Sequence, residues 1–282
     1  MLRSLFSAIS GLRSNQTMLD VTGNNIANAN TVGFKASNVV FQDTLSQMLT
    51  NSGAPSAPGV DPAQGGTNPI QVGLGVQVGA ITTNFNQGSA QVTGRATNLM
   101  ISGDGFFVIR RGNEELYTRA GAFNFDSNGN LVTPDGDIVQ GNDLRDSGKE
   151  KGVNIPELVS DTATPAMVSY AIGADGVITG VFDNGTKTPL FQIELANFAN
   201  PSGLEKAGDT TFRSSTNSGL VQKGNPGTGR LGNLMGGSLE MSNVDLAQEF
   251  TNLIIAQRGF QATSRVITTS DQVLEELVNL KR

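Results

Sequence analysis

The sequence predicts a mainly β protein with α-helical coiled-coil termini, in which a discontinuous helical domain formed by both chain ends carries an all-β body inserted between them. Three observations predict this class. Apolar residues recur every seven positions at both ends and every two positions in the middle, and stretches rich in glycine and proline separate the two patterns. We expect the helical domain at 1–35 and 240–282, an extended linker and loop at 36–69, and the β body at 70–239.

The N-terminal segment has the apolar stripe of a helix that needs a partner. Four residues lie seven positions apart, and a neighbouring row adds a fifth in the first turns: Leu5, Leu12, Leu19 and Ile26, with Ile9. A narrow stripe of this kind buries little surface by itself, so the helix must pack against another element.

The segment from 51 to 69 holds four prolines and four glycines and few residues that could pack, which favours a linker or long loop. A second glycine-rich stretch, Gly224 to Gly237, leads back to the C-terminal helix. We expect these two arms to be pliable. The alternative is that the first arm is packed between neighbouring subunits as a rigid gasket.

The middle of the chain has the period of β-strands. Apolar residues from Ile70 to Val78 alternate with glycine and glutamine, which predicts a half-buried strand. Asn-Gly and Asp-Gly pairs tolerate the positive φ angles of tight hairpins. They predict turns at Asn128-Gly129, Asp175-Gly176 and Asn184-Gly185, and Gly112-Asn113 predicts a fourth.

The C-terminal segment predicts a long helix with a second seven-residue stripe. The stripe contains Leu246, Leu253, Phe260, Ile267 and Leu274, with Phe250 on the neighbouring row. Ser242 is predicted to cap this helix, with Asp245 as its capping-box partner and Met241 and Leu246 as a hydrophobic staple. Either the two terminal helices pair within one ordinary domain, or they fold together only inside an assembly.

The composition excludes several function classes. The chain has 282 residues, a formal net charge of −6, and neither cysteine nor histidine. Thiol chemistry, histidine-activated nucleophiles, disulfides and the commonest zinc ligands are therefore excluded. The acidic balance gives no reason to expect nucleic acid, and no window approaches the roughly 20 apolar residues of a membrane span. We expect no enzymatic activity, no cofactor and no membrane insertion.

Two short motifs resemble ligand sites but lack the necessary context. Gly227 to Gly232 has the spacing of a dinucleotide-binding loop, but no βαβ pattern surrounds it. Asp126 to Asn130 faintly resembles a calcium loop, but its glycine falls at the wrong position and Pro134 interrupts it. A hairpin turn explains the second motif better.

Two longer motifs carry a family resemblance. GNNIANANTVGFK, at 23–35, resembles the N-terminal signature of the bacterial flagellar axial proteins that build the rod and hook, and Leu239 to Arg282 resembles their C-terminal signature. The N-terminal motif residues are Gly23, Asn24, Asn25, Ile26, Ala27, Asn28, Gly33, Phe34 and Lys35. Phe260-Gln261, Thr268-Thr269 and the stretch 67–81 resemble hook members more than rod members.

The resemblance implies a structural subunit that assembles with copies of itself. Its terminal helices are then expected to pack around a central channel, through the stripe residues named above. The resemblance favours the hook, a curved flexible tube that acts as a universal joint transmitting torque; the alternative is the distal rod, a straight drive shaft.

It further implies partners and a location. The expected partners are the distal rod protein, the hook cap, the hook–filament junction proteins and the flagellar type III export apparatus. The expected location is the extracellular hook, reached without a cleaved signal peptide.

Overall fold

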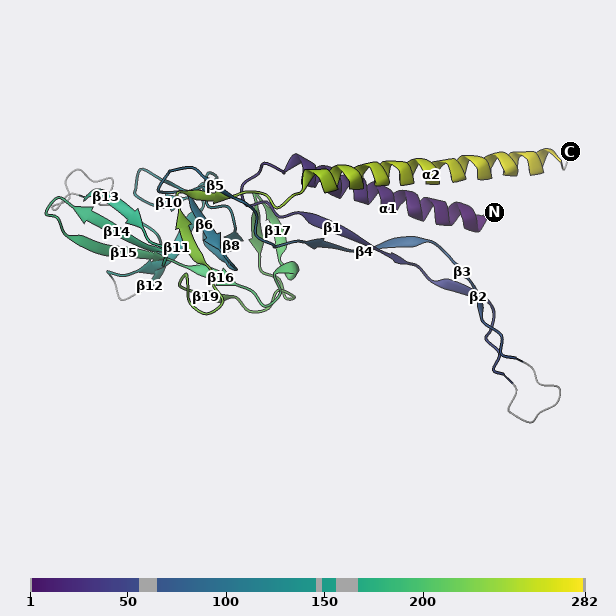
Figure 1. Cartoon of the computed structure of the whole chain (residues 1–282), viewed down its shortest axis with the longest axis horizontal. Coiled ribbons are helices and arrows are strands. Elements are labelled where there is room, and N and C mark those ends of the chain that lie inside the picture. Colours follow the sequence, from purple (N-terminus) through teal and green to yellow (C-terminus); the bar gives the residue numbers. More distant parts are fainter. Residues whose placement is uncertain (1, 56–64, 146–148, 156–166, 281–282) are drawn as a thin grey trace. The chain divides into compact units, whose positions relative to one another are not determined.

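The computed structural model describes residues 2–55, 65–145, 149–155 and 167–280. A helix stands at each end of this chain, with strands between them, so the predicted fold class is confirmed (Figure 1). The chain divides into two compact units. The helical unit comprises Met1–Ile26, Ser37–Thr82 and Asp245–Arg282, and the β unit comprises Ala27–Ala36 and Thr83–Val244.

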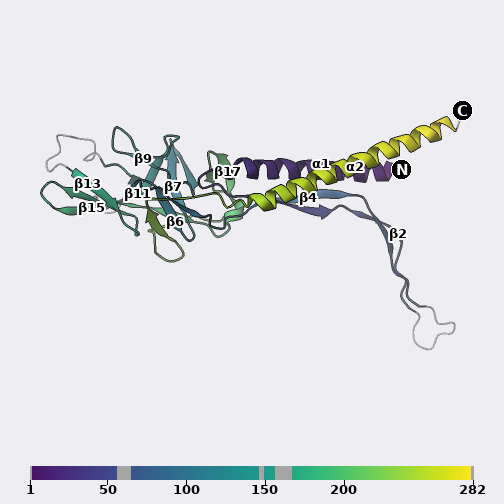
Figure 2. The same ribbon diagram turned by 45° about the horizontal axis from the view of Figure 1, so that its top comes forward.

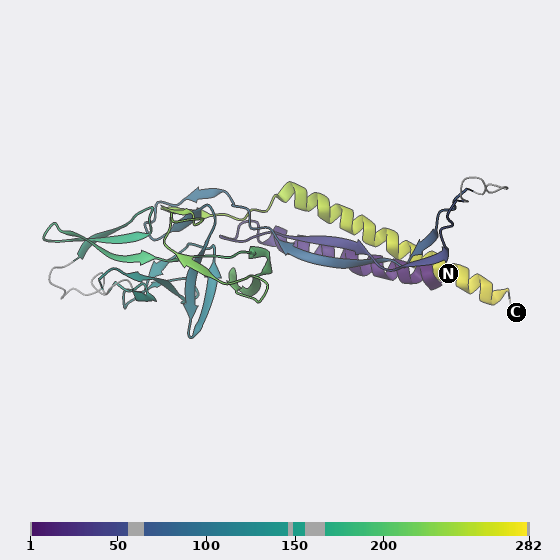
Figure 3. The ribbon, with the colours of Figure 1, turned by 90° about the horizontal axis from the view of Figure 1, so that it is seen from below.

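The helical unit contains both helices, α1 (Leu2–Ala27) and α2 (Leu246–Asn279). Three contacts fix their relative direction: Asn25 meets Glu249, Asn15 meets Gly259, and Gly11 meets Thr263. From one contact to the next, the residue number on α1 decreases by as much as the residue number on α2 increases, so the two helices are antiparallel. Figures 2 and 3 show this pair from two further sides.

The helical unit also contains a two-part β ribbon. Strand β1 (Ser37–Asp43) lies beside β4 (Val76–Thr83), and β2 (Ser46–Thr50) pairs with β3 (Ile70–Gly73), with Gln47 opposite Val72. An isolated bridge between Gly53 and Thr67 continues the pairing.

The ribbon corrects two expectations. Residues 37–50 are paired strands rather than an extended linker, because their partners lie well beyond the reach of a local sequence pattern. The single strand expected from Ile70 to Val78 is broken into β3 and β4 at Gly75, whose φ is +137°. A Cβ at Gly75 would lie 2.3 Å from Oγ of Ser10, so α1 and the ribbon meet closely there.

The β unit is built mainly on one antiparallel sheet, whose longest path runs β13-β14-β15-β11-β7-β8-β18-β17. The strands of the whole β unit, inside and outside this sheet, are β5 (Ala90–Val92), β6 (Leu99–Ser102), β7 (Phe106–Arg111), β8 (Glu114–Thr118), β9 (Asn124–Phe125), β10 (Leu131–Val132), β11 (Ile138–Asp143), β12 (Lys149–Gly152), β13 (Met167–Ile172), β14 (Val177–Phe182), β15 (Lys187–Ile193), β16 (Leu195–Asn197), β17 (Glu205–Gly208), β18 (Thr211–Arg213), β19 (Gln222–Gly224), β20 (Asn233–Gly236) and β21 (Ser238–Glu240). A short 3₁₀ helix, Pro201–Gly203, precedes β17.

The four predicted hairpin turns are present. Gly112, Gly129, Gly176 and Gly185 have φ between 62° and 78° at the turns β7–β8, β9–β10, β13–β14 and β14–β15. Within the β9–β10 turn, Oδ1 of Asp126 accepts hydrogen bonds from the backbone N–H groups of Asn128 and Asn130, both at 2.8 Å. The segment that resembled a calcium loop is therefore a hairpin.

Strand β7 lies at the centre of the core and is buried on both faces. Phe107 and Ile109 belong to one apolar cluster, and Phe106 and Val108 belong to another. Alternate side chains of a strand point to opposite faces, so a continuous apolar run is needed where both faces are covered. The sequence Phe106 to Ile109 supplies such a run.

Candidate assembly site

The contact between α1 and α2 is lined by small and polar side chains. Ala8, Thr22 and Asn25 of α1 are buried, as are Glu249 and Ala256 of α2. A Cβ at Gly259 would lie 2.9 Å from Oδ1 of Asn15. Glycine inside a helix costs about 1 kcal/mol relative to alanine. At position 259 it admits the Asn15 side chain and so permits close packing.

The predicted stripe residues lie mostly beside this contact. Leu5, Ile9, Leu12, Leu19 and Ile26 on α1 are half-buried, and so are Leu253, Phe260, Ile267 and Leu274 on α2. Leu246 and Phe250 remain 44% and 51% exposed. Counting large apolar residues revealed the stripe but missed the small residues that allow the helices to approach.

Helix α2 exposes a further set of large apolar side chains. Ile254, Ile255, Val266, Val273, Leu277 and Val278 are each between 43% and 67% exposed. Exposed large apolar side chains are typical of residues that a partner covers. These residues and the stripe residues together form the candidate assembly site.

The start of α2 differs from the expectation. Asp245 caps the helix, and its Oδ1 accepts hydrogen bonds from the N–H groups of Ala247 at 2.9 Å and Gln248 at 3.3 Å. The prediction that Ser242 is the cap was wrong. Ser242 Oγ instead accepts from the N–H of Val244, because the helix begins three residues later than the capping-box pattern suggested.

Asn25 of the family motif ties three segments of the helical unit together. Its Nδ2 donates to the carbonyl oxygen of Ser37 at 2.8 Å and to Oε1 of Glu249 at 3.2 Å, and its Oδ1 accepts from the N–H of Ser37 at 3.0 Å. Only 1% of Asn25 is exposed. Burial raises the pKa of the Glu249 carboxyl, and the bond from Asn25 opposes that shift. Asn25 therefore fixes the return of the chain after α1.

Gly33 has a separate steric role in the β unit. Its φ is +70°, and a Cβ at this position would lie 2.5 Å from the backbone nitrogen of Ala120. Its N–H donates to the carbonyl oxygen of Glu240 at 2.8 Å. Any other residue would be strained in conformation and would collide with the neighbouring backbone.

Lys35 belongs to a buried ion cluster. Its Nζ donates to Oε1 of Glu240 at 2.5 Å and to the carbonyl oxygen of Asn86 at 2.8 Å, and Arg119 Nη1 donates to Oε2 of Glu240 at 3.3 Å. Burial lowers the pKa values of both Lys35 and Arg119, and Glu240 opposes that shift. No local pattern indicates that Lys35 and Glu240 meet, because they lie 205 positions apart.

The other motif residues have smaller roles. Oδ1 of Asn28 accepts from the hydroxyl of Thr31 at 3.0 Å, and the ammonium of Lys206 lies 5.4 Å from the ring centre of Phe34. Asn24 and Ala27 are exposed. A Cβ at Gly23 would meet no described atom within 4 Å, so nothing in this structure explains a glycine there.

The described residues lack two other kinds of site. None of their helices combines the length and apolarity needed to cross a membrane. Over the same parts of the chain, acidic side chains form no group of three that could hold a metal ion. Gly227 to Gly232 closes a turn through the bond from Gly227 N–H to the Gly232 carbonyl, between strands β19 and β20.

Comparisons with known proteins match both ends and part of the body of the chain. Residues 5–35 match the family described as "Flagella basal body rod protein", residues 100–180 match "Flagellar hook protein FlgE/F/G D1 domain", and residues 235–280 match "Flagellar basal body rod FlgEFG protein C-terminal".

Relatives of both kinds, rod and hook, align with the whole chain. The flagellar basal-body rod protein FlgG of Bacillus subtilis is 48% identical over 283 residues, and that of Borreliella burgdorferi is 35% identical over 284. The flagellar hook protein FlgE of Borreliella burgdorferi is 32% identical over 446 residues. Each alignment covers 100% of this chain and 100% of the relative.

The fold, the helical chain ends and these matches define a structural protein of the flagellum, not an enzyme. Such proteins assemble with copies of themselves in the basal body or hook. The chain belongs to the family of flagellar rod and hook proteins.

Proposed function

We propose that the chain is the distal rod subunit of the flagellar basal body, which self-assembles into a straight tube that serves as a drive shaft. The observation that carries the proposal is the 48% identity to a basal-body rod protein over an alignment of 283 residues that covers both chains completely. This chain has 282 residues, so the two proteins align almost without insertions.

The hook relatives fit less well in sequence and in length. Their alignments run over 446 and 468 residues at 32% and 29% identity, although they too cover this chain completely. The hook proteins therefore contain long segments with no counterpart here. The preference for the hook rested on a few local residues, including Phe260 and Gln261, whereas the full-length similarity favours the rod.

The β ribbon gives independent physical support. A drive shaft must resist bending, and a paired ribbon restricts backbone motion more than a glycine-rich linker does. In this chain β1 to β4 form such a ribbon, and in sequence it separates the Ala27–Ala36 segment from the rest of the β unit. The partners of this proposal are copies of the chain, neighbouring rod and hook proteins, and the flagellar type III export apparatus.

Complementation tests the rod against the hook. A strain that lacks its own distal rod gene should regain swimming when it expresses this chain, and a strain that lacks its hook gene should not. Electron microscopy of isolated basal bodies should show straight extensions of the rod. Curved polymers in the hook-deficient strain would contradict the rod proposal and favour the hook as the function of this chain.

We further propose that the α-helical stripes hold neighbouring subunits together. Leu253, half-buried on α2, tests this assignment. Leu253→Asp should leave the β unit folded, since that unit has its own core, but should stop polymer formation because a buried unpaired carboxylate costs several kcal/mol. Gln257→Asp adds the same charge at an exposed position of α2 and should polymerise. Normal polymers from Leu253→Asp would exclude the stripe as the surface that holds neighbouring subunits together.

A further inference from the structure

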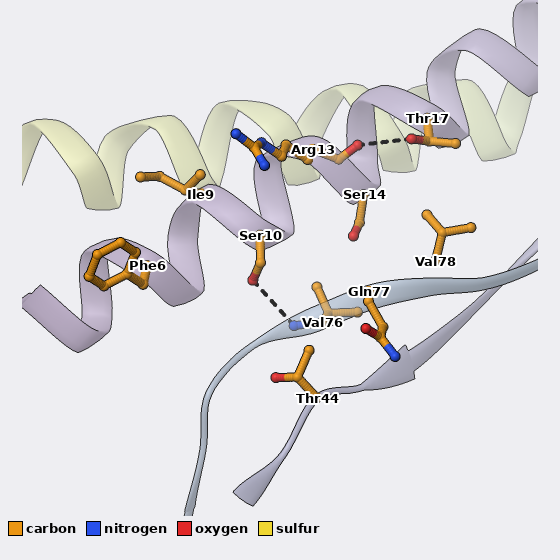
Figure 4. Close-up of a pocket in the computed structure, with 10 residues that line it drawn as sticks. All are labelled: Phe6, Ile9, Ser10, Arg13, Ser14, Thr17, Thr44, Val76, Gln77 and Val78. Atoms are coloured by element: carbon orange, nitrogen blue, oxygen red, sulfur yellow. Dashed lines mark hydrogen bonds between the residues drawn. The ribbon is translucent and has the colours of Figure 1, made fainter.

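The described residues form hollows of different character. An open groove of about 430 Å³ lies in the helical unit beside α1, where Oγ of Ser10 accepts the N–H of Val76 at 3.2 Å (Figure 4). The one charged residue that lines this groove, Arg13, is exposed. A smaller cavity of about 130 Å³ lies within the β unit and is lined by Arg119, of which only 3% is exposed. Because burying a cation is costly unless acceptors surround it, the partners of Arg119 decide what this Arg119 cavity can hold.

Arg119 has fewer hydrogen-bond partners than a buried guanidinium can use. Its Nη1 donates to Oε2 of Glu240 at 3.3 Å. Neither Nε, which is buried, nor Nη2 has a partner among the described residues. A guanidinium carries five N–H donors, and a buried donor without an acceptor is rare in folded proteins. The edge of Arg119 that Nε and Nη2 form therefore lacks an acceptor within the described chain.

A second arginine shows which group suits this edge. Nε and Nη2 of Arg111 donate to the two carboxylate oxygens of Asp137 at 2.9 Å and 2.8 Å. This side-on pairing matches two parallel N–H groups to two oxygens and is among the stronger hydrogen-bonded ion pairs. A carboxylate is therefore the natural acceptor for the same edge of Arg119.

The charges around the cavity favour an anion with a single charge. The buried cluster contains two cations, Lys35 and Arg119, against one carboxylate, Glu240. Two exposed residues, Arg230 and Asp104, add one charge of each sign to the lining. Three cations and two anions leave an excess of one positive charge. A carboxylate balances this excess, whereas a doubly charged sulfate would exceed it and would also meet Asp104.

The other walls fit a carboxylate with a short hydrocarbon tail. Asn197 lines the cavity, and because its Oδ1 accepts the N–H of Phe198 at 2.8 Å, Nδ2 is the part of the amide that can donate to a ligand. The rings of Phe85, Phe106 and Phe198 line the cavity as well. The volume of about 130 Å³ exceeds the roughly 10–15 Å³ that one water molecule needs, so a group of several atoms can enter.

We propose that the Arg119 cavity binds the carboxylate of a short-chain acid, either a free molecule or an aspartate or glutamate side chain of another protein. The carboxylate accepts hydrogen bonds from the Nε–Nη2 edge of Arg119. Arg230 supplies a further positive charge, Asn197 supplies a neutral donor, and the three rings cover the hydrocarbon tail. This inference goes beyond the proposed function and does not depend on the choice between rod and hook, because the cavity belongs to the β unit of a single chain.

Nuclear magnetic resonance of the full-length, unpolymerised chain measures this binding. Sodium propionate is added at about pH 7, where it is ionised, and at constant ionic strength. The side-chain N–H signals of Arg119 and Asn197 are expected to shift and to reach saturation. Propionamide, which has the same shape without the charge, and sodium sulfate are expected to give no saturable shift. Equal binding of sulfate or propionamide would overturn the assignment of a carboxylate.

Two substitutions at exposed positions test the charges without changing the buried cluster. Arg230→Gln should weaken propionate binding on the order of tenfold, because a cation beside the carboxylate is lost. Asp104→Asn should strengthen it by several-fold, because a like charge is removed. Arg213→Gln removes an exposed arginine on β18, outside the cavity, and is the matched control that should bind like the natural chain. If Arg230→Gln binds propionate as well as Arg213→Gln does, the inference falls.

A pair of peptides separates the two sources of the carboxylate. A tripeptide blocked at both ends, with a central glutamate, has its only carboxylate on the side chain, and its glutamine counterpart has none. Saturable binding of the glutamate peptide but not of the glutamine peptide identifies an acidic side chain as the ligand. Binding of propionate without the glutamate peptide identifies a free acid. If neither propionate nor the glutamate peptide binds the folded chain, the inference is overturned, and the rod proposal still stands or falls on complementation.

Discussion

The ammonium nitrogen of Lys35 lies 2.5 Å from Oε1 of Glu240, and neither side chain is exposed to solvent. Lys35 closes the family motif at 23–35, and Glu240 ends strand β21 just before α2. The pair therefore joins, inside the β unit, the segment that leaves the first helix to the segment that leads to the second. Asn25 and Glu249 make the equivalent connection inside the helical unit.

Removing one member of this ion cluster should destabilise the β unit strongly. Glu240→Gln leaves Lys35 and Arg119 buried without a carboxylate, and breaking a buried pair costs about 3–5 kcal/mol. Urea unfolding followed by circular dichroism should show this loss. Arg213→Met, which removes an exposed ion pair with Glu114, is the control and should cost less than about 1 kcal/mol. Equal losses from both variants would contradict a special role for Glu240.

Two glycines of the motif should respond in opposite ways to the same substitution. Gly33→Ala places a Cβ against the Ala120 backbone at a φ of +70°, so it should lower the free energy of unfolding by more than about 1 kcal/mol. Gly23→Ala meets open space within α1 and should stabilise the helix by up to about 1 kcal/mol. Thermal melts of the two variants provide the measurement. If Gly33→Ala is as stable as the natural chain, the steric argument is wrong.

The stability of the β unit should fall as pH rises through neutrality. Glu194, between β15 and β16, is only 7% exposed, and burial followed by the nearby charge of Glu150 raises its pKa to about 7. The other charged groups of this cluster are Glu115 on β8, Lys223 on β19 and Arg110 on β7. One lysine is thus shared between Glu115 and Glu150, and Glu194 Oε2 has no hydrogen-bond partner among the described residues.

Proton linkage determines the direction in which stability changes with pH. A carboxyl whose folded pKa is raised contributes stability that is fully present below its ordinary pKa of 4.5 and is lost as pH rises through about 7. The expected loss is about 3 kcal/mol across this window. Glu194→Gln cannot ionise, so its unfolding free energy should be flatter between about pH 5 and pH 8. An equally steep pH profile in Glu194→Gln would assign the effect to another group.

The sequence predicted the elements whose signals are local. The stripe through Leu253 and Phe260 predicted α2, and single dipeptides such as Asn184-Gly185 predicted hairpins, because turn conformation depends on the residues in the turn. Pairing between distant segments leaves no local pattern. Strand β2 pairs with β3, and a stretch of sequence rich in proline and glycine separates the two strands. Residues 46–50 therefore resembled part of a linker.

The same reason explains what was missed at the candidate site. Asn25 was identified only as part of the motif at 23–35, because its bonds to Ser37 and Glu249 depend on chain segments up to 224 positions away. Glycine at position 259 has low helix propensity, and only the position of Asn15 reveals the close contact that it permits. The choice between rod and hook required comparison over the full length of the chain, because rod and hook proteins share the terminal motifs.

The mechanical role of the ribbon can be tested at its outer bridge, where the Gly53 and Thr67 N–H groups each donate to the other residue's carbonyl oxygen at 3.0 Å. Thr67→Pro removes one N–H donor and should fray the ribbon, because proline cannot contribute a hydrogen bond to a strand ladder.

The ribbon exposes large apolar side chains that neighbouring subunits are expected to cover in a polymer. They are between 43% and 84% exposed and comprise Leu45, Met48, Leu49, Ile70 and Val72. A frayed ribbon should then give polymers that form but bend more, seen as a shorter persistence length in electron micrographs. Thr67→Ser keeps the N–H and should leave stiffness unchanged. A complete loss of polymers would show that the bridge is needed for assembly itself, as a packed gasket would be, and unaltered stiffness in Thr67→Pro would exclude the ribbon as the source of rigidity.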